Sequence, residues 1–218
     1  MRWVTFDCYG TLADWRGGMA AALRPIVGPH IDRLMAAYYD EELEVERENP
    51  GMRYRDVLAE GLQRAAASER IALPEGAERA FGEHWPEIPI FKDVGPALSA
   101  LREAGWSLGI LTNCDDDLIA QTVARMPVAI DEIVTAEQGG SYKPAHGHWQ
   151  RFAELTEGRR DAWVHAANSW VIDIQPTSEL GIPRVWVDRD RSGHDPSIAD
   201  AVVADLTGLP RAVSDLQR

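Results

Sequence analysis

Cysteine is scarce in this 218-residue sequence, which contains only Cys8 and Cys114. Two cysteines cannot build the disulfide framework of a small secreted domain, and they cannot supply the four thiolates of a structural zinc site. We therefore interpret both residues as small side chains of the hydrophobic core. The chain is long enough to bury such a core without covalent support.

Long apolar runs are also missing. No stretch of the sequence approaches the roughly 20 apolar residues that a membrane-spanning helix needs. The first residues, MRWVTFDCYG, lack the apolar segment and the small-residue cleavage site of a secretory signal. These absences predict a soluble protein, located in the cytoplasm.

Positive charge is in short supply as well. The sequence has 22 Lys and Arg residues against 35 Asp and Glu, a formal net charge of −13. Binding to nucleic acid or to an anionic membrane requires a cationic footprint, so we expect neither partner. The acidic excess favours solubility, and a lysine inside a cleft can still offset it locally for an anionic substrate.

The sequence does contain short apolar runs that alternate with helical periodicity or with glycine and proline turns. This alternation predicts an α/β fold with a parallel sheet, and the continuously apolar character of the runs indicates strands that are buried on both faces. The length fits either one large α/β domain or a domain of about 150 residues with a smaller insert. The runs are RWVTF (2–6), LGILT (108–112), EIVTA (132–136), AWVHAA (162–167), RVWV (184–187) and AVVAD (201–205).

One interval, from about residue 14 to residue 89, breaks the alternation because it holds no convincing strand. Its apolar residues recur at the i, i+3, i+4 spacing of amphipathic helices, which predicts a helical insert after the first strand. We expect its connectors at Gly17-Gly18 and in the proline-rich segment 86–96. The periodic positions are Ile31, Leu34 and Tyr38, then Tyr54, Val57, Leu58 and Leu62, and finally Ala77, Phe81 and Trp85.

Polar residues follow several of the predicted strands directly. Because ligands of open α/β sheets bind beyond the carboxyl ends of the strands, these residues are the candidates for a site. They are Asp7, Gly10 and Thr11 after the first run, Thr112 and Asn113 after the second, Lys143 in the loop GGSYKP, and Asn168, Ser169 and Asp173 after AWVHAA.

Each candidate also has an ordinary structural explanation. Asp7, Thr112 or Ser169 alone could cap a helix, Lys143 alone could be a solvated surface amine, and Asp173 could balance a helix N-terminus. Together, an acid, a hydroxyl, an amine and a second acid at the ends of distinct strands would meet in one crevice. A carboxylate beside an ammonium stays ionised, and this arrangement describes an activated aspartate nucleophile.

Four segments resemble the motifs of a known superfamily. In this order, FDCYGTL, ILTNCDD, SYKP and ANSWVIDIQPTSELGIPRVWVDR look like motifs one to four of the haloacid dehalogenase superfamily, in its L-2-haloacid dehalogenase (type II) branch. The resemblance spans essentially the whole chain. It implies a Rossmann-like core of residues 1–13 and 93–218 with an inserted all-helical cap of residues 14–92. The first motif is also similar to that of azetidine-2-carboxylate hydrolases.

The resemblance also implies a mechanism. Asp7 would displace a halide or similar leaving group from C2 of a small carboxylic acid, and water would then hydrolyse the resulting ester with help from Lys143 and Asp173. Hydroxyl and amide groups would hold the carboxylates of Asp7 and of the substrate. These supporting residues are Thr11, Thr112, Asn113 and Ser169.

Tyr9 stands where phosphatases of this superfamily carry a second aspartate, which protonates the departing alkoxide. A phenol with a pKa of about 10 is a poor general acid at neutral pH, whereas a halide leaves without a proton. The fourth motif offers Asp173 but no adjacent acid, so we expect neither a metal nor another cofactor. Mg²⁺ would be required only if the protein were instead a weak phosphatase, and a catalytically idle binding protein on the same fold is a further alternative.

The sequence departs from the family pattern in the cap. L-2-haloacid dehalogenases grip the halide with a cap arginine, but the corresponding segment here is the acidic run AAYYDEELEVERE. Arg33, Arg47 or Arg53 could replace that arginine only in a different helix register. The run is either a solvated helix face or presents Tyr39 or a glutamate to a neutral or cationic leaving group.

Two more departures concern the pocket wall. Trp149 replaces a tyrosine of the family pattern, and Asn168 is the nearest candidate for an asparagine expected close to Trp170. With Tyr9 and Tyr39, these residues are the predicted substrate contacts. His165 is expected in the core, and the resemblance leaves a homodimer open.

Overall fold

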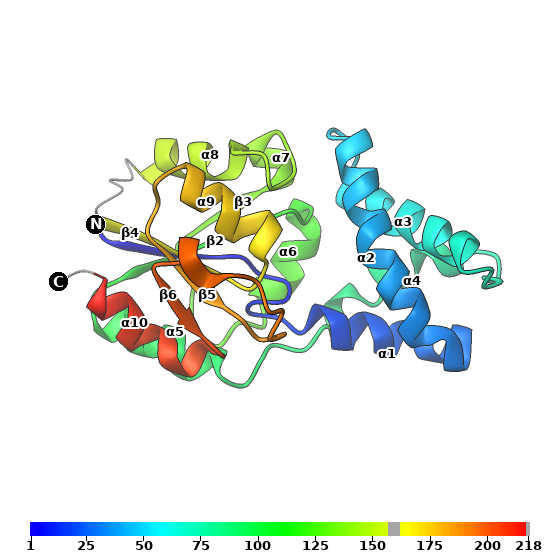
Figure 1. Ribbon diagram of the computed structural model, residues 1–218, viewed down its shortest axis with the longest axis horizontal. Coiled ribbons are helices and arrows are strands. Elements are labelled where there is room, and N and C mark those ends of the chain that lie inside the picture. The colour runs from blue at the N-terminus through cyan, green and yellow to red at the C-terminus, as the bar shows by residue number, and fades with distance from the viewer. Residues whose placement is uncertain (157–161, 217–218) are drawn as a thin grey trace.

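The computed structural model describes residues 1–156 and 162–216, and its centre is a six-stranded parallel sheet (Figure 1). The strand order is β3-β2-β1-β4-β5-β6, so the first strand of the chain lies in the interior of the sheet. Each strand coincides with one of the six predicted apolar runs, which confirms the α/β prediction. The strands are β1 (Trp3–Phe6), β2 (Ser107–Thr112), β3 (Glu132–Thr135), β4 (Trp163–Ala167), β5 (Arg184–Val187) and β6 (Ala201–Val203).

Helices surround this sheet and extend beyond it. In the described parts of the chain they are α1 (Trp15–Val27), α2 (Ile31–Glu48), α3 (Tyr54–Ser68), α4 (Ala80–Glu83), α5 (Val94–Glu103), α6 (Asp116–Val123), α7 (Ala136–Gly139), α8 (Gly147–Thr156), α9 (Gln175–Glu179) and α10 (Leu209–Asp215). Short 3-10 turns occupy Gly28–His30, Ala77–Arg79, Trp85–Glu87, Pro196–Ile198 and Leu206–Gly208, and a π-helical turn occupies Trp170–Ile174. None of the described helices has the length and apolar character needed to cross a bilayer.

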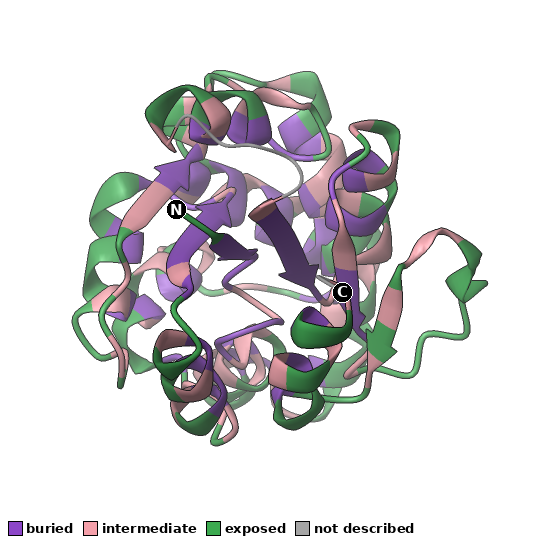
Figure 2. Cartoon of the chain, turned by 90° about the vertical axis from the view of Figure 1, so that its left-hand side faces the viewer, coloured by how far each residue is buried: buried purple, intermediate pink, exposed green. Residues whose placement is uncertain are grey.

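The sheet is covered on both faces. Helices α5 and α10 pack against each other on one side, while α7 and α8 contact each other and β3 on the other (Figure 1). The central strands are largely buried and the outer faces of the surrounding helices are exposed (Figure 2). Val4, Phe6 and Val164 are fully buried, as expected for strands with apolar neighbours on both faces.

Strand register places the candidate residues at one edge of the sheet. Phe6 of β1 is paired with Ile110 of β2 and with Ala166 of β4. The polar residues that follow these three strands therefore lie side by side at the carboxyl edge, where ligands bind in open α/β sheets.

Helices α1 to α4 lie to one side of the sheet, between β1 and α5 in the chain (Figure 1). Helices α2 and α3 match the predicted amphipathic segments and pack against each other. The chain enters and leaves this insert at one place, which we call the crossing ribbon (residues 12–14 and 89–91). There the Asp14 amide donates to the Pro89 carbonyl at 2.8 Å, and the Phe91 amide donates to the Leu12 carbonyl at 3.0 Å.

Two expectations for the insert are wrong. Gly17 and Gly18 are not a connector: they lie in the first turn of α1, where the Asp14 carboxylate accepts a hydrogen bond from the Gly17 amide at 2.9 Å. A Cβ at Gly17 would collide with that carboxylate, which explains the glycine at this position. Because paired glycines are typical of turns, the sequence did not indicate that a helix begins here. The third predicted helix, over Ala77 to Trp85, is instead a 3-10 turn, the short α4 and a second 3-10 turn. Pro86 has no amide hydrogen with which to continue α4.

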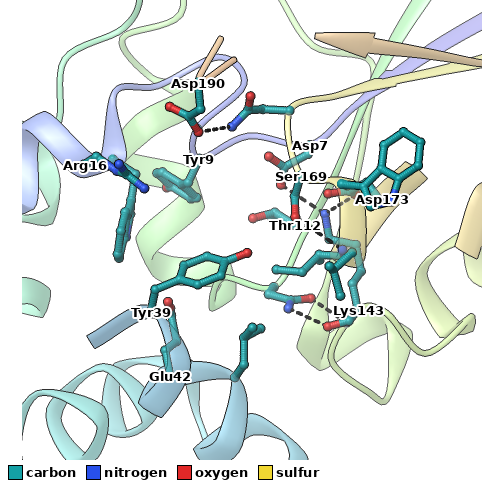
Figure 3. Close-up of a pocket in the computed structure, with 18 of the residues that line it drawn as sticks. Asp7, Tyr9, Arg16, Tyr39, Glu42, Thr112, Lys143, Ser169, Asp173 and Asp190 are labelled. Atoms are coloured by element: carbon teal, nitrogen blue, oxygen red, sulfur yellow. Dashed lines mark hydrogen bonds and ion pairs between the residues drawn. The ribbon is translucent and has the colours of Figure 1, made fainter. Parts of the chain in front are cut away.

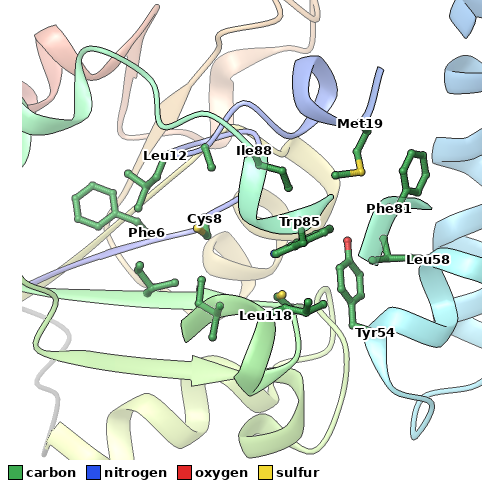
Figure 4. Close-up of a cluster of buried hydrophobic side chains, with 14 of the residues drawn as sticks. Phe6, Cys8, Leu12, Met19, Tyr54, Leu58, Phe81, Trp85, Ile88 and Leu118 are labelled. Atoms are coloured by element: carbon green, nitrogen blue, oxygen red, sulfur yellow. The ribbon is translucent and has the colours of Figure 1, made fainter. Parts of the chain in front are cut away.

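One hydrophobic cluster runs from the sheet into the insert (Figure 4). It includes Phe6 and Leu12 on the side of the sheet, and Leu58, Phe81 and Trp85 on the side of the insert, all fully buried. The insert is therefore packed onto the sheet as part of the same core.

Asp115 adds a polar link between the two parts. This residue lies just before α6, is 1% exposed, and accepts hydrogen bonds from the amides of Tyr54 at 2.8 Å and Arg55 at 3.0 Å. These are the first amides of α3, which have no partner within their own helix. The core thus supplies the N-terminal cap of a helix in the insert.

We expect Asp115→Ala to lower the free energy of unfolding by about 2 kcal/mol, because two amides at the start of α3 lose a buried acceptor. Chemical denaturation measures the change. Asp117→Ala is the matched control: Asp117 pairs with Arg53 and Arg55 at the exposed surface, so its loss should cost under about 1 kcal/mol. Equal effects of the two substitutions would contradict the capping role.

Candidate active site

A buried lysine joins two buried aspartates at the carboxyl edge of the sheet. The Nζ of Lys143 donates to Asp7 Oδ1 at 3.0 Å, to Asp173 Oδ1 at 2.7 Å and to the carbonyl of Leu111 at 3.0 Å. Lys143 is 1% exposed and Asp173 is 0% exposed. The three hydrogens of the Lys143 ammonium therefore have three acceptors, and the ammonium is held in one place.

Asp7 follows β1 directly and is held by a second donor. The hydroxyl of Thr11 donates to Asp7 Oδ2 at 2.8 Å, and the same oxygen of Thr11 accepts from the Asn168 amide at 2.9 Å. Gly10 has φ +93°, a left-handed conformation that favours glycine and turns the chain between Asp7 and Thr11. Both carboxylate oxygens of Asp7 are thereby oriented.

Asp173 lies in the π-helical turn that follows β4. Its Oδ1 accepts from Lys143 and also contacts His165 Nε2 at 3.2 Å. Its Oδ2 is equally buried but has no hydrogen-bond partner in the described structure. Asp173 therefore keeps one buried acceptor oxygen without a partner among the described residues.

The two aspartates that share the Lys143 ammonium have pKa values shifted in opposite directions. Burial raises the pKa of Asp7 above its ordinary value and the Asp173 charge acts in the same direction, against Lys143 and Thr11. Burial also disfavours charge on Asp173, but Lys143 and His165 outweigh it and hold the pKa of Asp173 below its ordinary value. The two carboxylates together raise the pKa of Lys143 in spite of its burial. Asp7 is therefore the more basic carboxylate of the pair.

These side chains line a cavity of about 480 Å³ between the sheet edge and the helical insert (Figure 3). Asp7, Lys143 and Asp173 form one wall, and residues of α2 face them from the insert. A volume of this size suits a small molecule.

Three of the four predicted supporting residues, Thr112, Asn113 and Ser169, line this cavity, but their hydrogen bonds go to groups other than Asp7. Thr112 Oγ1 accepts from the Cys114 amide rather than binding Asp7. Asn113 binds the Lys143 backbone through its Oδ1 at 2.7 Å, and its Nδ2 reaches the Glu46 carboxylate at 3.2 Å. Ser169 lines the cavity and also caps the π-helical turn, where its Oγ accepts from the Ile172 amide.

Tyr9 lines the cavity, but its hydroxyl is committed elsewhere. It accepts from Trp85 Nε1 at 2.6 Å and is hydrogen-bonded to Thr122 at 2.8 Å. Burial raises the pKa of Tyr9 well above that of an ordinary phenol. The side chain therefore links the sheet to the insert and is a still poorer acid than the sequence suggests.

Helix α2 presents acids to the cavity. Glu42 and Glu46 are 8% and 5% exposed, and the Tyr54 hydroxyl donates to Glu42 at 2.5 Å. Burial raises the pKa of Glu42 to about 7 and raises that of Glu46 well above its ordinary value. Tyr39 projects from the same helix toward Ser169 (Figure 3). The acidic run is thus not merely a solvated face.

The three arginines that could have replaced the family's cap arginine lie away from the cavity. Arg33 pairs with Glu69, Arg47 with Glu44, and Arg53 with Asp115 and Asp117, and these three arginines do not line the cavity. Arg16, in the first turn of α1, does line it, and its guanidinium has no ion pair or hydrogen bond to any described residue. The sequence analysis missed Arg16 because it took residues 17–18 for a connector.

Two predicted wall residues behave differently. Asn168 lines the cavity, with its Nδ2 bound to Asp190 at 3.0 Å. Trp149 does not line it, contrary to the prediction: it is 1% exposed and packs in a hydrophobic cluster with Leu111 and Trp163. It lies on α8, where its i, i+3 spacing with the buried Phe152 was the signal for a core position.

A family model for haloacid dehalogenase-like hydrolases matches residues 1–166. This chain belongs to that family. The motifs quoted above from the sequence therefore identified the superfamily correctly, and the six-stranded parallel sheet with its helical layers is the fold of haloacid dehalogenase structures.

Several relatives of this haloacid dehalogenase-like hydrolase have been characterised. It is 23% identical over 203 residues to the (S)-2-haloacid dehalogenase of Pseudomonas fluorescens, covering 88% of this chain and 86% of that protein. It is 24% identical to haloacetate dehalogenase H-2 of Moraxella sp. (strain B), covering 92% and 95%.

Solved structures with similarly low sequence identity show the same fold. The L-2-haloacid dehalogenase RSc1362 superimposes with a TM-score of 0.87 at 22% identity, covering 98% of this chain and 99% of that one. The L-2-haloacid dehalogenase of Xanthobacter autotrophicus with chloropropionic acid covalently bound superimposes with a TM-score of 0.81 at 16% identity, covering 98% of each chain.

The hydrolase does not offer the donor set of a resident Mg²⁺. That ion prefers an octahedron of oxygen ligands, but the two carboxylates at the sheet edge, Asp7 and Asp173, are each already bound to the Lys143 ammonium. The described residues contain no group of three His, Cys, Asp or Glu side chains placed to hold a metal. We therefore derive no catalytic step through a metal.

Glu42 makes the stability of the hydrolase depend on pH. Its pKa is 4.5 in an ordinary environment and about 7 in the folded protein, so the unfolded chain loses this proton first as the pH rises. The folded state is therefore destabilised between those two values, by up to about 3 kcal/mol. Glu42→Gln should remove this loss, so the variant should be more stable than the parent above pH 7 and gain nothing below about pH 4.

Denaturant titrations across that pH range measure the difference. Glu41→Gln, on the same helix but outside the cavity, is the matched control and should follow the parent protein at every pH. A constant offset between Glu42→Gln and the parent would show that Glu42 does not titrate in this interval.

Proposed function

We propose that this protein hydrolyses small 2-substituted carboxylic acids, in the manner of a 2-haloacid dehalogenase, through an ester formed on Asp7. The observation that carries the proposal is the Lys143 ammonium, which binds both Asp7 and Asp173 at the wall of a small cavity. The 2-haloacid dehalogenases among its relatives support the choice of substrate class.

In the first step, an oxygen of Asp7 attacks C2 of the substrate. The bond from C2 to the leaving group breaks, and its electron pair departs with the halide. No proton is required, which agrees with the committed hydroxyl of Tyr9. The raised pKa of Asp7 makes its carboxylate a stronger nucleophile than an ordinary aspartate.

In the second step, water attacks the Cγ of the Asp7 ester. In this proposal Asp173 accepts the proton of that water through Oδ2, which has no other hydrogen-bond partner among the described residues, and the ester bond breaks to release the 2-hydroxy acid. Lys143 stabilises the negative charge that develops on the Asp7 oxygen during this step. The product carries an oxygen that came from Asp7, and Asp7 is restored with an oxygen from water.

The other cavity residues have supporting roles in this proposal. Thr11 orients Asp7, and Asn113 orients the Lys143 loop. Thr112 and Ser169 offer hydrogen bonds to the substrate carboxylate, and three side chains shape the wall. These wall residues are Tyr9, Tyr39 and Asn168. Residues 14–92 act as the cap of the site, over a core of residues 1–13 and 93–218.

Arg16 is the candidate to attract the substrate carboxylate. The other cations that line the cavity are committed: Lys143 to the two aspartates, and Arg189 to Asp93 at 2.9 Å. Arg16 is exposed at the cavity and carries no partner within the described residues. It can therefore receive an anion at little cost in broken contacts.

The two alternatives are less well supported. A phosphatase needs an acid for its alkoxide leaving group and usually Mg²⁺, and the site lacks a suitable donor set for the metal. An idle binding protein has no need for three ionisable groups buried in mutual contact, because burying them is costly unless each is paired.

A single turnover in H₂¹⁸O tests the proposal. With enzyme in excess over 2-chloropropionate, ¹⁸O should enter the peptide that contains Asp7, and the first product molecule should carry none. Asp7→Asn should lose about 10³-fold or more in turnover. Recovery of ¹⁸O in the first product would indicate direct attack by water and overturn the ester.

Arg16→Gln is the comparison variant in the same assay. It should raise KM by about tenfold and leave kcat within about twofold, because the residue binds the substrate but does not react. EDTA should leave turnover unchanged.

The acidic wall of α2 favours a second candidate substrate. A protonated ring nitrogen on C2 would face Glu42 and Glu46, where L-2-haloacid dehalogenases place an arginine. Azetidine-2-carboxylate has this chemistry, and the first motif is similar to that of hydrolases acting on it. When Asp7 attacks C2, the strained C–N bond breaks and the nitrogen leaves as a neutral amine that stays tethered to the product.

A pair of substrates separates the two candidates. At about pH 8, above the pKa of Glu42, Glu42→Gln should raise KM for azetidine-2-carboxylate by about tenfold, since the carboxylate opposite the ammonium is lost. It should leave 2-chloropropionate hydrolysis unchanged. Release of chloride without any ring opening by the parent protein would eliminate the second candidate.

A further inference from the structure

His165 of β4 lies beside the site, and its ring is fully buried. Its ring packs edge-on against Trp149, with 5.7 Å between the ring centroids, as expected for a core residue. Both ring nitrogens are nevertheless within hydrogen-bonding distance of polar side chains. His165 Nδ1 lies near the Thr5 hydroxyl, and His165 Nε2 lies near the Asp173 carboxylate. A buried histidine hydrogen-bonded to both side chains can hold Thr5 and Asp173 in fixed positions.

A chain of hydrogen bonds runs from Trp163 to Asp173, and the chemistry of its groups sets its direction. The indole N–H of Trp163 can only donate, and it does so to Thr5 Oγ1 at 2.7 Å. The hydroxyl hydrogen of Thr5 is then available to His165 Nδ1, at 2.9 Å. Because Nδ1 accepts, the proton of the neutral ring is on Nε2, which donates to Asp173 Oδ1 at 3.2 Å.

The other protonation states of His165 fit this network less well. With the proton on Nδ1 alone, the lone pair of Nε2 would face the lone pairs of the Asp173 carboxylate. With both nitrogens protonated, Thr5 Oγ1 would accept twice, and its own hydrogen would have no acceptor among the described residues. Such an unpaired group is costly at a fully buried position. The network therefore assigns the neutral Nε2–H tautomer.

The consequence appears at Asp173. Both donors, Lys143 and His165, reach the same oxygen, Oδ1, from different elements. Two fixed donors on one oxygen leave the carboxylate little freedom to rotate. The second oxygen, Oδ2, stays without a partner although it is buried, and Asp173 lines the cavity.

We propose that His165 is a positioning residue for the hydrolytic half of the reaction, holding Asp173 Oδ1 so that Oδ2 receives the proton of the attacking water, with Thr5 setting the tautomer. The inference rests on the function proposed above. In the step concerned, the water oxygen bonds to Asp7 Cγ and the water proton moves to Asp173 Oδ2. The ester C–O bond then breaks, and the departing oxygen of the hydroxy acid takes that proton.

This role separates the two half-reactions. Displacement at C2 transfers no proton and does not use Asp173 Oδ2, so it is independent of His165. Hydrolysis of the ester does use it. Disturbing the chain should therefore slow the second step and leave the first intact, whereas general damage to the core would slow both.

Thr5→Val and Thr5→Ser form the sharpest pair of variants. Valine keeps the shape of threonine but removes the hydroxyl that donates to Nδ1, while serine keeps the hydroxyl. With 2-chloropropionate, Thr5→Val should release one chloride per active site at the parental rate and then turn over about tenfold or more slower. The Asp7 ester should accumulate and be visible by mass spectrometry of the intact protein. Thr5→Ser should behave as the parent.

His165→Gln and His165→Leu make the same comparison at the ring itself. Glutamine can place an N–H near the position of Nε2 and should retain much of the hydrolytic rate, whereas leucine should accumulate the ester. The thermal unfolding midpoint of each variant is measured alongside, and this second pair decides the matter if Thr5→Val does not fold.

The outcomes are distinguishable. If the parent protein incorporates no ¹⁸O into the Asp7 peptide during a single turnover in H₂¹⁸O, the proposed function itself is overturned. An ester in the parent with normal turnover in Thr5→Val and His165→Leu would overturn the positioning role alone. An equal slowing of the chloride burst and of steady-state turnover would reduce His165 to a structural residue and would also overturn the inference.

Discussion

The arrangement of the site depends on one buried cation. Lys143 is almost fully enclosed, and its three hydrogens are shared between Asp7, Asp173 and a backbone carbonyl. Removing the amine would leave two carboxylates facing each other in a region of low dielectric, where neither could remain charged cheaply. The same contact sets the two acids apart in basicity, with Asp7 the more basic of the two.

That contact exists only because distant segments end at the same edge of the sheet. β1 delivers Asp7, the π-helical turn after β4 delivers Asp173, and the loop after α7 delivers Lys143. The insert completes the enclosure, and polar links at Asp115, Tyr9 and Glu46 attach it to the sheet. Each of these hydrogen bonds joins a residue that follows β1 or β2 to a residue of the insert. A displacement of the insert would therefore move residues at the carboxyl edge of the sheet.

Much of this could be predicted from the sequence, because the signals were local. Continuous apolar runs marked all six strands, and the residues after them marked Asp7, Lys143 and Asp173 as neighbours. The errors came from features that only tertiary structure decides. Gly17 was taken for a turn residue, but it lies in a helix where a Cβ would collide with the Asp14 carboxylate. Trp149 was taken for a pocket residue, but it packs in a hydrophobic cluster of the core. The roles assigned to the individual site residues, and the boundaries of the cap, stay predictions.

The crossing ribbon has a consequence for how such a protein can diversify. The helical insert departs from the sheet at residues 12–14 and returns at residues 89–91, and these two segments are hydrogen-bonded to each other. An insert with both ends at one point can be exchanged for another of different length or shape without moving any strand. The helical insert is thus a topologically separable unit, while the buried lysine and its two aspartates belong to segments that follow the strands of the sheet.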